Sequence, residues 1–131
     1  MKDPRLDLLA HAHKYPAELS GGQVQRLNFV RALAAKPSLL LCDEPFSALD
    51  EITRLRMQRW LLDVWQTGET TILFVTHSIE EALFLSDRVV VIKDGRIRQE
   101  FDIAFARPRT NDIRFTKQFI ALRQKILSVI E

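Results

Sequence analysis

Apolar residues recur at helical spacing in two stretches of the chain. The first predicts a helix that starts after Ser20 and stops at Pro37, whose ring cannot continue a helix. The apolar positions that share one face of this helix are Val24, Leu27, Val30 and Ala34. The second predicts a helix from Asp50 to about Gln66. The residues expected to face inward on this helix are Ile52, Leu55, Leu62 and Trp65.

Short continuous apolar runs lie between these helical stretches. They predict strands over Ser38–Cys42 and Thr71–Thr76, and Gly68 separates the second strand from the helix before it. Continuous apolar strands that alternate with helices are typical of an α/β sheet whose strands are buried on both faces. The fold class predicted for the chain is therefore α/β.

The last third of the chain predicts a helix, a hairpin and a second helix. Ser78, with Glu81 three residues on, indicates a capping box for a short helix that ends near Leu85. The turn pair Asp94-Gly95 joins two predicted strands, Arg88–Lys93 and Arg96–Asp102. A final helix is predicted from about Asp112. Its apolar stripe consists of Phe115, Phe119, Leu122, Ile126 and Val129.

Composition narrows the class of protein. The 131 residues suit one domain, and an apolar fraction of 47% allows a real core. No apolar run is long enough to cross a bilayer and no signal peptide is evident, so we expect a cytosolic protein. The lone Cys42, inside an apolar run, is expected to be a buried, unreactive thiol.

Charge gives no reason to expect a nucleic-acid partner. The formal net charge is only +2, and acidic residues are interspersed with the basic residues of the tail. We interpret those basic residues as a solvated helix face; they are Arg107, Arg109, Arg114, Lys117, Arg123 and Lys125. His11 and His13 lack the further Cys or His pair that a zinc site would need, so we predict no metal site there.

The segment Leu19–Gln23 is the first with candidate chemistry. Ser20 is placed to cap the helix that follows, and Gln23 completes a capping box. Gly21 and Gly22 leave the first helical amides bare, so an anion could approach the positive end of the helix dipole. The alternative is a capped helix start with no ligand.

Polar residues follow both predicted strands at their carboxyl ends. Asp43 and Glu44 come after the first strand, and His77 comes directly after the second. Ligands of open α/β sheets bind beyond the carboxyl ends of the strands, so both groups should face one site. A carboxylate at this place can hold Mg²⁺ at a phosphate site, and a neighbouring one can activate a water molecule. Solvated acids and a structural histidine are the alternative.

Four segments together resemble ABC ATPases. The signature motif is matched by Leu19–Gln23 and the Walker B motif by Asp43–Pro45. The D-loop is matched by Ser47–Asp50 and the H-loop by Thr76–His77, so the four motifs come in the family's order. The resemblance implies a partial nucleotide-binding domain, a phosphate-loop NTPase sheet flanked by helices with a C-terminal hairpin and helix. Residues 1–36 would be the end of the helical subdomain, with the signature motif. Residues 37–104 would contain Walker B, the D-loop, the H-loop and the hairpin, and residues 105–131 would contain the last helix.

The resemblance also implies roles for residues. Ser20, Gly21, Gly22 and Gln23 would contact the γ-phosphate of an ATP held mainly by a partner cassette. Asp43 would hold Mg²⁺, and Glu44 would be the general base. His77 would sense the γ-phosphate, and Asp50 would cross the dimer interface.

The chain departs from the family in lacking a phosphate-binding loop. That loop needs a glycine followed by lysine and then serine or threonine, and none of the four glycines has this context. We therefore expect the chain to be the C-terminal half of a cassette, inactive by itself and prone to self-association. Met1 is expected to be an internal methionine of a longer protein.

Importer subunits are resembled by the lead-in Tyr15–Glu18 and by the run Val75–Ala82. The tail is similar to the nitrate, sulfonate and taurine importer group, through Gly95–Ile97, Arg107–Arg109 and the closing helix with Phe119, Leu122, Ile126 and Leu127. The partners implied are a second ATPase subunit, a transmembrane permease and, indirectly, an extracytoplasmic solute-binding protein. The chain itself would be cytoplasmic and peripheral on the inner face of the cell membrane. The alternative is a non-catalytic half-cassette that lends its signature to a complete partner. A soluble ABC ATPase of DNA repair or translation would usually carry insertions or a second cassette.

Overall fold

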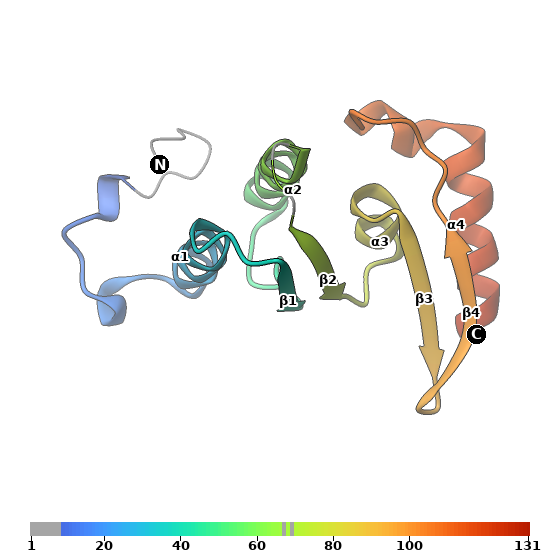
Figure 1. The fold of residues 1–131 in the computed structure, drawn as a ribbon, viewed down its shortest axis with the longest axis horizontal. Coiled ribbons are helices and arrows are strands. Elements are labelled where there is room, and N and C mark those ends of the chain that lie inside the picture. The colour runs from blue at the N-terminus through green and yellow to red at the C-terminus, as the bar shows by residue number, and fades with distance from the viewer. Residues whose placement is uncertain (1–8, 67, 69) are drawn as a thin grey trace. The chain divides into compact units, whose positions relative to one another are not determined.

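The computed structural model describes residues 9–66, 68 and 70–131, so the expectation about Met1 lies outside the described residues. The chain forms two compact units, residues 1–75 and residues 76–131, which are described here one at a time. Figure 1 identifies their helices and strands. The division falls inside the predicted middle segment, between the second strand and His77.

The first unit is built on two parallel strands and two helices. Two short 3-10 helices, Leu9–His11 and Pro16–Glu18, precede α1, which spans Gly21–Ala34. Strand β1, Leu39–Asp43, pairs in parallel with β2, Thr71–Val75, with Leu39 opposite Thr71 and Asp43 opposite Val75. Helix α2, Glu51–Gln66, joins the two strands. The predicted β-α-β order is confirmed (Figure 1).

Aromatic rings form the centre of this unit. The ring of Phe29 on α1 lies 6.0 Å from Phe46 and 6.0 Å from Trp60 on α2, both edge to face. The buried residues of α1 are Phe29 and Leu33, so the predicted face is wrong: Leu27 and Ala34 are exposed. The face that packs is chosen by the loop after β1, which the helical period alone does not reveal. Ile52 of α2 was also predicted to face inward, but it is 65% exposed.

Within the described part of the first unit, the two strands are covered on one face only. Leu40 is buried, whereas the other face of the sheet exposes Leu39, Leu41, Leu73 and Val75 by 52%, 66%, 60% and 60%. These four residues alternate along the paired strands, as side chains on one face of a sheet must. The expectation of burial on both faces is therefore wrong for the described residues. The exposed apolar face fits the expected self-association.

The second unit contains a short helix, a hairpin and a long helix. Helix α3 spans Ile79–Leu85, and β3, Arg88–Lys93, pairs antiparallel with β4, Arg96–Asp102. Asp94 and Gly95 both have positive φ, 54° and 70°, as a two-residue turn of this hairpin requires. Helix α4, Lys117–Ile130, packs against α3 and β3. The hairpin is confirmed.

The last helix starts later than the predicted Asp112. Residues Asn111–Phe115 form a 3-10 helix, and Thr116 then caps α4 by accepting a hydrogen bond from the Phe119 amide at 3.3 Å. Phe115 consequently lies outside the apolar stripe and is 79% exposed. The remainder of that stripe faces inward, with Phe119 and Ile126 fully buried. Phe119 stacks on Phe105 at 5.7 Å.

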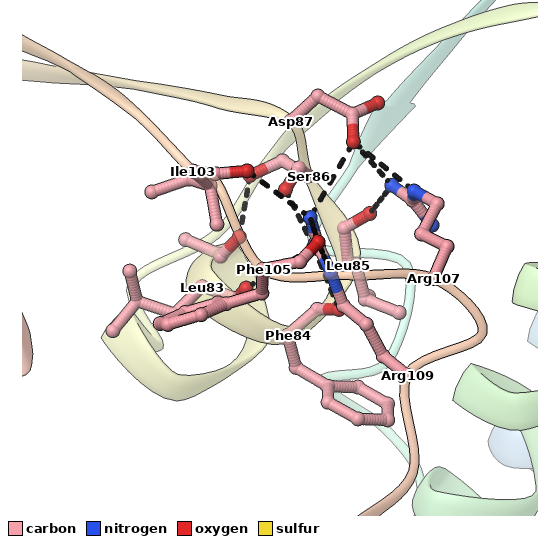
Figure 2. A network of polar contacts seen from close by, with 10 residues as sticks. Leu83, Phe84, Leu85, Ser86, Asp87, Ile103, Phe105, Arg107 and Arg109 are labelled. Atoms are coloured by element: carbon pink, nitrogen blue, oxygen red, sulfur yellow. Dashed lines mark hydrogen bonds and ion pairs between the residues drawn. The ribbon is translucent and has the colours of Figure 1, made fainter. Parts of the chain in front are cut away.

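Three of the tail arginines do not form a solvated face. Figure 2 shows Arg107 and Arg109 directed at the end of α3 and at Asp87. The Arg109 side chain is 0% exposed, and those of Arg107 and Arg114 are 19% and 15% exposed. Burial lowers the pKa of Arg109, the charge of Arg107 lowers it further, and Asp87 raises it. The predicted solvated face is correct only for Lys117, Arg123 and Lys125 on α4.

Within the described ranges, no helix is both long and apolar enough to span a membrane.

Candidate functional site

The start of α1 has the predicted capping box. The Ser20 hydroxyl accepts a hydrogen bond from the Gln23 amide at 3.3 Å, and the Ser20 amide donates to Gln23 Oε1 at 2.9 Å. Gln23 Nε2 lies 2.8 Å from Nε2 of His11, which orients the side-chain amide. The box uses two of the amides that a helix start otherwise leaves unpaired.

The two glycines of this segment have different surroundings. A Cβ atom added to Gly21 would meet nothing within 4 Å in the described part of the chain. At Gly22 it would lie 3.0 Å from the Ala48 carbonyl oxygen and 3.3 Å from Leu49 Cδ2. Gly22 therefore allows α1 to approach the loop after β1, whereas Gly21 leaves open space at the helix start.

This difference predicts opposite effects on stability. Gly22→Ala should destabilise the chain by roughly 1–3 kcal/mol, because the backbone of Ala48 has to move. Gly21→Ala, the matched control, should be neutral or stabilise by up to about 1 kcal/mol, since alanine is the better helix former. Urea unfolding of both variants measures the effect. Equal stability of the two would contradict the close packing at Gly22.

The acidic pair lies where β1 ends. Asp43 is the last residue of the strand and is exposed, and Glu44 follows it half-buried. The Glu44 amide donates to the Val75 carbonyl at 2.9 Å, so the ends of β1 and β2 are tied together. Glu44 has a φ of 46°, in the left-handed region that non-glycine residues rarely adopt. Such conformations occur often at functional sites.

Asp43 is suited to bind Mg²⁺ together with a nucleotide. Mg²⁺ usually binds one or two protein carboxylates together with substrate phosphates and water. An exposed carboxylate at a strand end offers that single ligand. Among residues 9–66, 68 and 70–131, no group of three or more histidine, cysteine or acidic side chains is placed to hold a metal alone.

The loop after β1 is held against one face of α1. Gly22 meets Ala48, Phe29 meets Phe46, and Gln25 between them bonds to the loop backbone. Gln25 Nε2 donates to the Glu44 carbonyl at 2.8 Å, and Gln25 Oε1 accepts from the Ala48 amide at 3.1 Å. Our sequence reasoning missed Gln25. Its spacing from Gly22 and Phe29 places all three on one helix face, which was the available signal.

Asp50 caps α2. Its Oδ1 accepts from the Thr53 amide at 3.0 Å, and helix α2 begins one residue later, at Glu51. The hydroxyl and then the amide of Thr53 lower the pKa of Asp50, which is exposed. The carboxylate therefore stays ionised at the surface, at the end of the loop that α1 holds. Its role at a dimer interface stays a prediction.

His77 belongs to the second unit, where hydrogen bonds hold the residues on either side of it. The Thr76 hydroxyl donates to Glu81 Oε2 at 2.8 Å and accepts from the Ser78 amide at 3.1 Å. Ser78 Oγ accepts from the Glu81 amide at 3.3 Å, which is half of the predicted capping box. The Ser78 amide bonds to Thr76 instead of completing the box. That exposed His77 shares a site with Asp43 and Glu44 stays a prediction.

Cys42 is half-buried on β1 rather than fully buried. Burial raises the pKa of its thiol to about 11, so the thiol is protonated at neutral pH. The expected unreactive character fits this environment.

The family described as ABC transporter matches residues 4–47. The aliphatic sulfonates import ATP-binding protein SsuB 3 of Nocardia farcinica is 48% identical over 120 residues, which are 92% of this chain and 47% of that protein. SsuB of Albidiferax ferrireducens is 46% identical over 123 residues, 94% of this chain and 43% of that protein. The chain spans about half the length of the curated relatives it matches.

Solved structures show the same likeness. The ATP-binding cassette MJ0796, in a dimeric post-hydrolysis state bound to ADP and Pi, superposes with a TM-score of 0.66 at 32% identity, over 79% of this chain and 46% of that chain. The cassette MJ1267 superposes with a TM-score of 0.71 over 96% of this chain and 46% of that chain. At 21% identity that second likeness concerns the fold alone. The structure is a partial ABC ATPase domain, and the chain belongs to the ABC transporter family, with importer-type ATP-binding proteins among its relatives.

Proposed function

We propose that this chain supplies the signature, Walker B, D-loop and H-loop parts of an ATPase that energises an import system. The observation that carries the proposal is the packing of the Ser20-capped helix start onto the loop after Glu44, through Gly22 and Gln25. The two segments to which we assign phosphate chemistry, the start of α1 and the loop after β1, thereby pack against each other within the first unit. The phosphate-binding loop would come from a second stretch of polypeptide, and "assembled ATPase" denotes this chain together with that stretch.

In the assembled ATPase, each proposed residue has one task. Ser20, Gly21, Gly22 and Gln23 present helix amides and side chains to the γ-phosphate of an ATP bound by the partner cassette. Glu44 accepts a proton from the attacking water, and His77 donates a hydrogen bond to a γ-phosphate oxygen. Asp50 lies at the interface between cassettes. Asp43 would hold Mg²⁺, which supplies positive charge against the phosphates.

The proposed partners follow from the relatives. Proteins named as aliphatic sulfonate import ATP-binding proteins are among them, and the MJ0796 cassette is a dimer. We propose a dimer of cassettes docked to a membrane permease on the inner face of the cell membrane, with a solute-binding protein acting through that permease. The solute would be selected by the permease and the binding protein rather than by this chain.

The purified chain by itself should not hydrolyse MgATP. It contains no glycine followed by lysine and serine or threonine, so it lacks the backbone cradle for the β- and γ-phosphates. Phosphate release from MgATP, measured with the purified chain, should equal the background without protein. Turnover that Glu44→Gln abolishes would contradict this prediction.

A non-catalytic half-cassette is the second candidate, favoured by the same missing loop. Two variants of the assembled ATPase separate the candidates. Gly21→Asp puts a carboxylate where a phosphate should approach, and the open space around Gly21 accommodates it. Loss of hydrolysis in both Gly21→Asp and Glu44→Gln supports the catalytic role. Loss in Gly21→Asp alone means that this chain only lends its signature.

A further inference from the structure

Glu44 keeps its left-handed backbone because its carbonyl and amide are both held. The amide donates to Val75, as described above. The carbonyl accepts hydrogen bonds from Gln25 Nε2 at 2.8 Å, from the Ser47 hydroxyl at 3.0 Å and from the Ser47 amide at 3.2 Å. The bond from Gln25 reaches the carbonyl from α1, outside the turn.

Gln25 is suited to this task by both ends of its amide. A primary amide is both a donor and an acceptor. Here Nε2 donates to the Glu44 carbonyl, and Oε1 accepts from the Ala48 amide. The two contacts lie four residues apart and span the turn between them. Gln25 lies on α1, two residues after Gln23, so the same helix that carries the signature fixes the turn after β1.

We infer that Gln25 is a positioning residue for Glu44: its side-chain amide holds the left-handed turn that directs the Glu44 carboxylate. This inference rests on the proposed role of Glu44 as general base. Gln25 does not touch the reacting atoms, and its effect on hydrolysis passes through Glu44. The signature helix and the general base of one chain are thereby coupled by one side chain.

A double-mutant cycle in the assembled ATPase tests the inference. Gln25→Met keeps the length of the side chain and removes both hydrogen bonds. It should lower kcat by roughly 10- to 100-fold with an almost unchanged KM for ATP, because a misplaced catalytic group slows the chemical step. In a Glu44→Gln background the same change should have no further effect, since the group that Gln25 positions is gone. Gln118→Met, an exposed glutamine on α4, is the matched control.

A second variant covers the case in which Gln25→Met does not fold. Gln25→Glu keeps an acceptor for the Ala48 amide and loses the Nε2 donor, which bonds to the Glu44 carbonyl at 2.8 Å and to Ser47 Oγ at 3.5 Å, so kcat should still fall at least about tenfold. Equal losses with and without Glu44→Gln would mean a purely structural role and overturn the inference, as would an unchanged kcat in both Gln25 variants. If Glu44→Gln alone retains full turnover, the proposed function fails instead, and the inference fails with it.

Discussion

Replacing Glu44 with glutamine in the assembled ATPase is expected to reduce hydrolysis by roughly 100- to 10,000-fold, the usual contribution of a general base. Glutamine has the shape of glutamate but cannot accept the proton of the attacking water. The backbone hydrogen bonds of residue 44 do not involve its side chain, so the turn should persist. ATP binding should therefore survive, and only the chemical step should be lost.

Single-turnover hydrolysis and equilibrium ATP binding, measured on the same preparation, check this result. Glu100→Gln on the exposed face of β4 makes the same chemical change and should leave both quantities unaltered. Hydrolysis within a few-fold of the parent in Glu44→Gln would remove Glu44 from the mechanism. Loss of ATP binding would instead point to a structural defect.

Local signals in the sequence predicted elements well where neighbouring residues decide the structure. The Ser20–Gln23 capping box lies within four residues, and the Asp94-Gly95 turn needs only two positive φ angles. Both are confirmed. The final helix starts late because Thr116 caps it, whereas the apolar stripe extends back to Phe115 and so indicates an earlier start.

Tertiary packing decided what the local pattern could not. The apolar period of α1 marked Leu27 and Ala34, but the loop after β1 contacts the face with Gly22, Gln25 and Phe29. A polar glutamine gives no hydrophobic signal, so its helical spacing from Gly22 and Phe29 indicates the face that it shares with them but not its hydrogen bonds to Glu44 and Ala48. The roles of Ser20, Asp43 and Glu44 stay predictions, and the sequence did not point to Gln25, which bonds to the loop backbone at Glu44 and Ala48.

Charge alone also misled the interpretation of the tail. A run of basic residues is normally solvated, yet Arg109 is the most buried charged side chain of this segment. Its guanidinium donates to the carbonyls of Leu83, Phe84 and Ser86 at 3.3, 3.1 and 2.7 Å, at the C-terminal end of α3. It also reaches the carbonyls of Ile103 and Phe105, on the segment after β4 (Figure 2). Planar guanidinium supplies five donors, which matches this arrangement.

Arg109 stabilises the fold mainly through its hydrogen bonds to carbonyl groups, rather than through its ion pair with Asp87. The Asp87 carboxylate lies 3.4 Å away but is 60% exposed, so solvent screens the pair and its contribution is small. The last carbonyls of a helix have no partner within that helix and need one from elsewhere. Arg109 provides it for α3, and at the same time ties α3 to residues 103–105.

Arg109→Met should therefore destabilise the second unit by at least about 3 kcal/mol, because several buried carbonyls lose their donor together. Arg109→Lys should fall between the parent and Arg109→Met, since an ammonium with three donors cannot reach both groups of carbonyls. Native-state hydrogen exchange of the β3 amides measures the change in this unit directly. Arg98→Met, which removes an exposed arginine of the hairpin, should change protection by less than about 0.5 kcal/mol. A change of under about 1 kcal/mol in Arg109→Met would contradict this role, because it would mean that water satisfies the carbonyls as well as the buried guanidinium does.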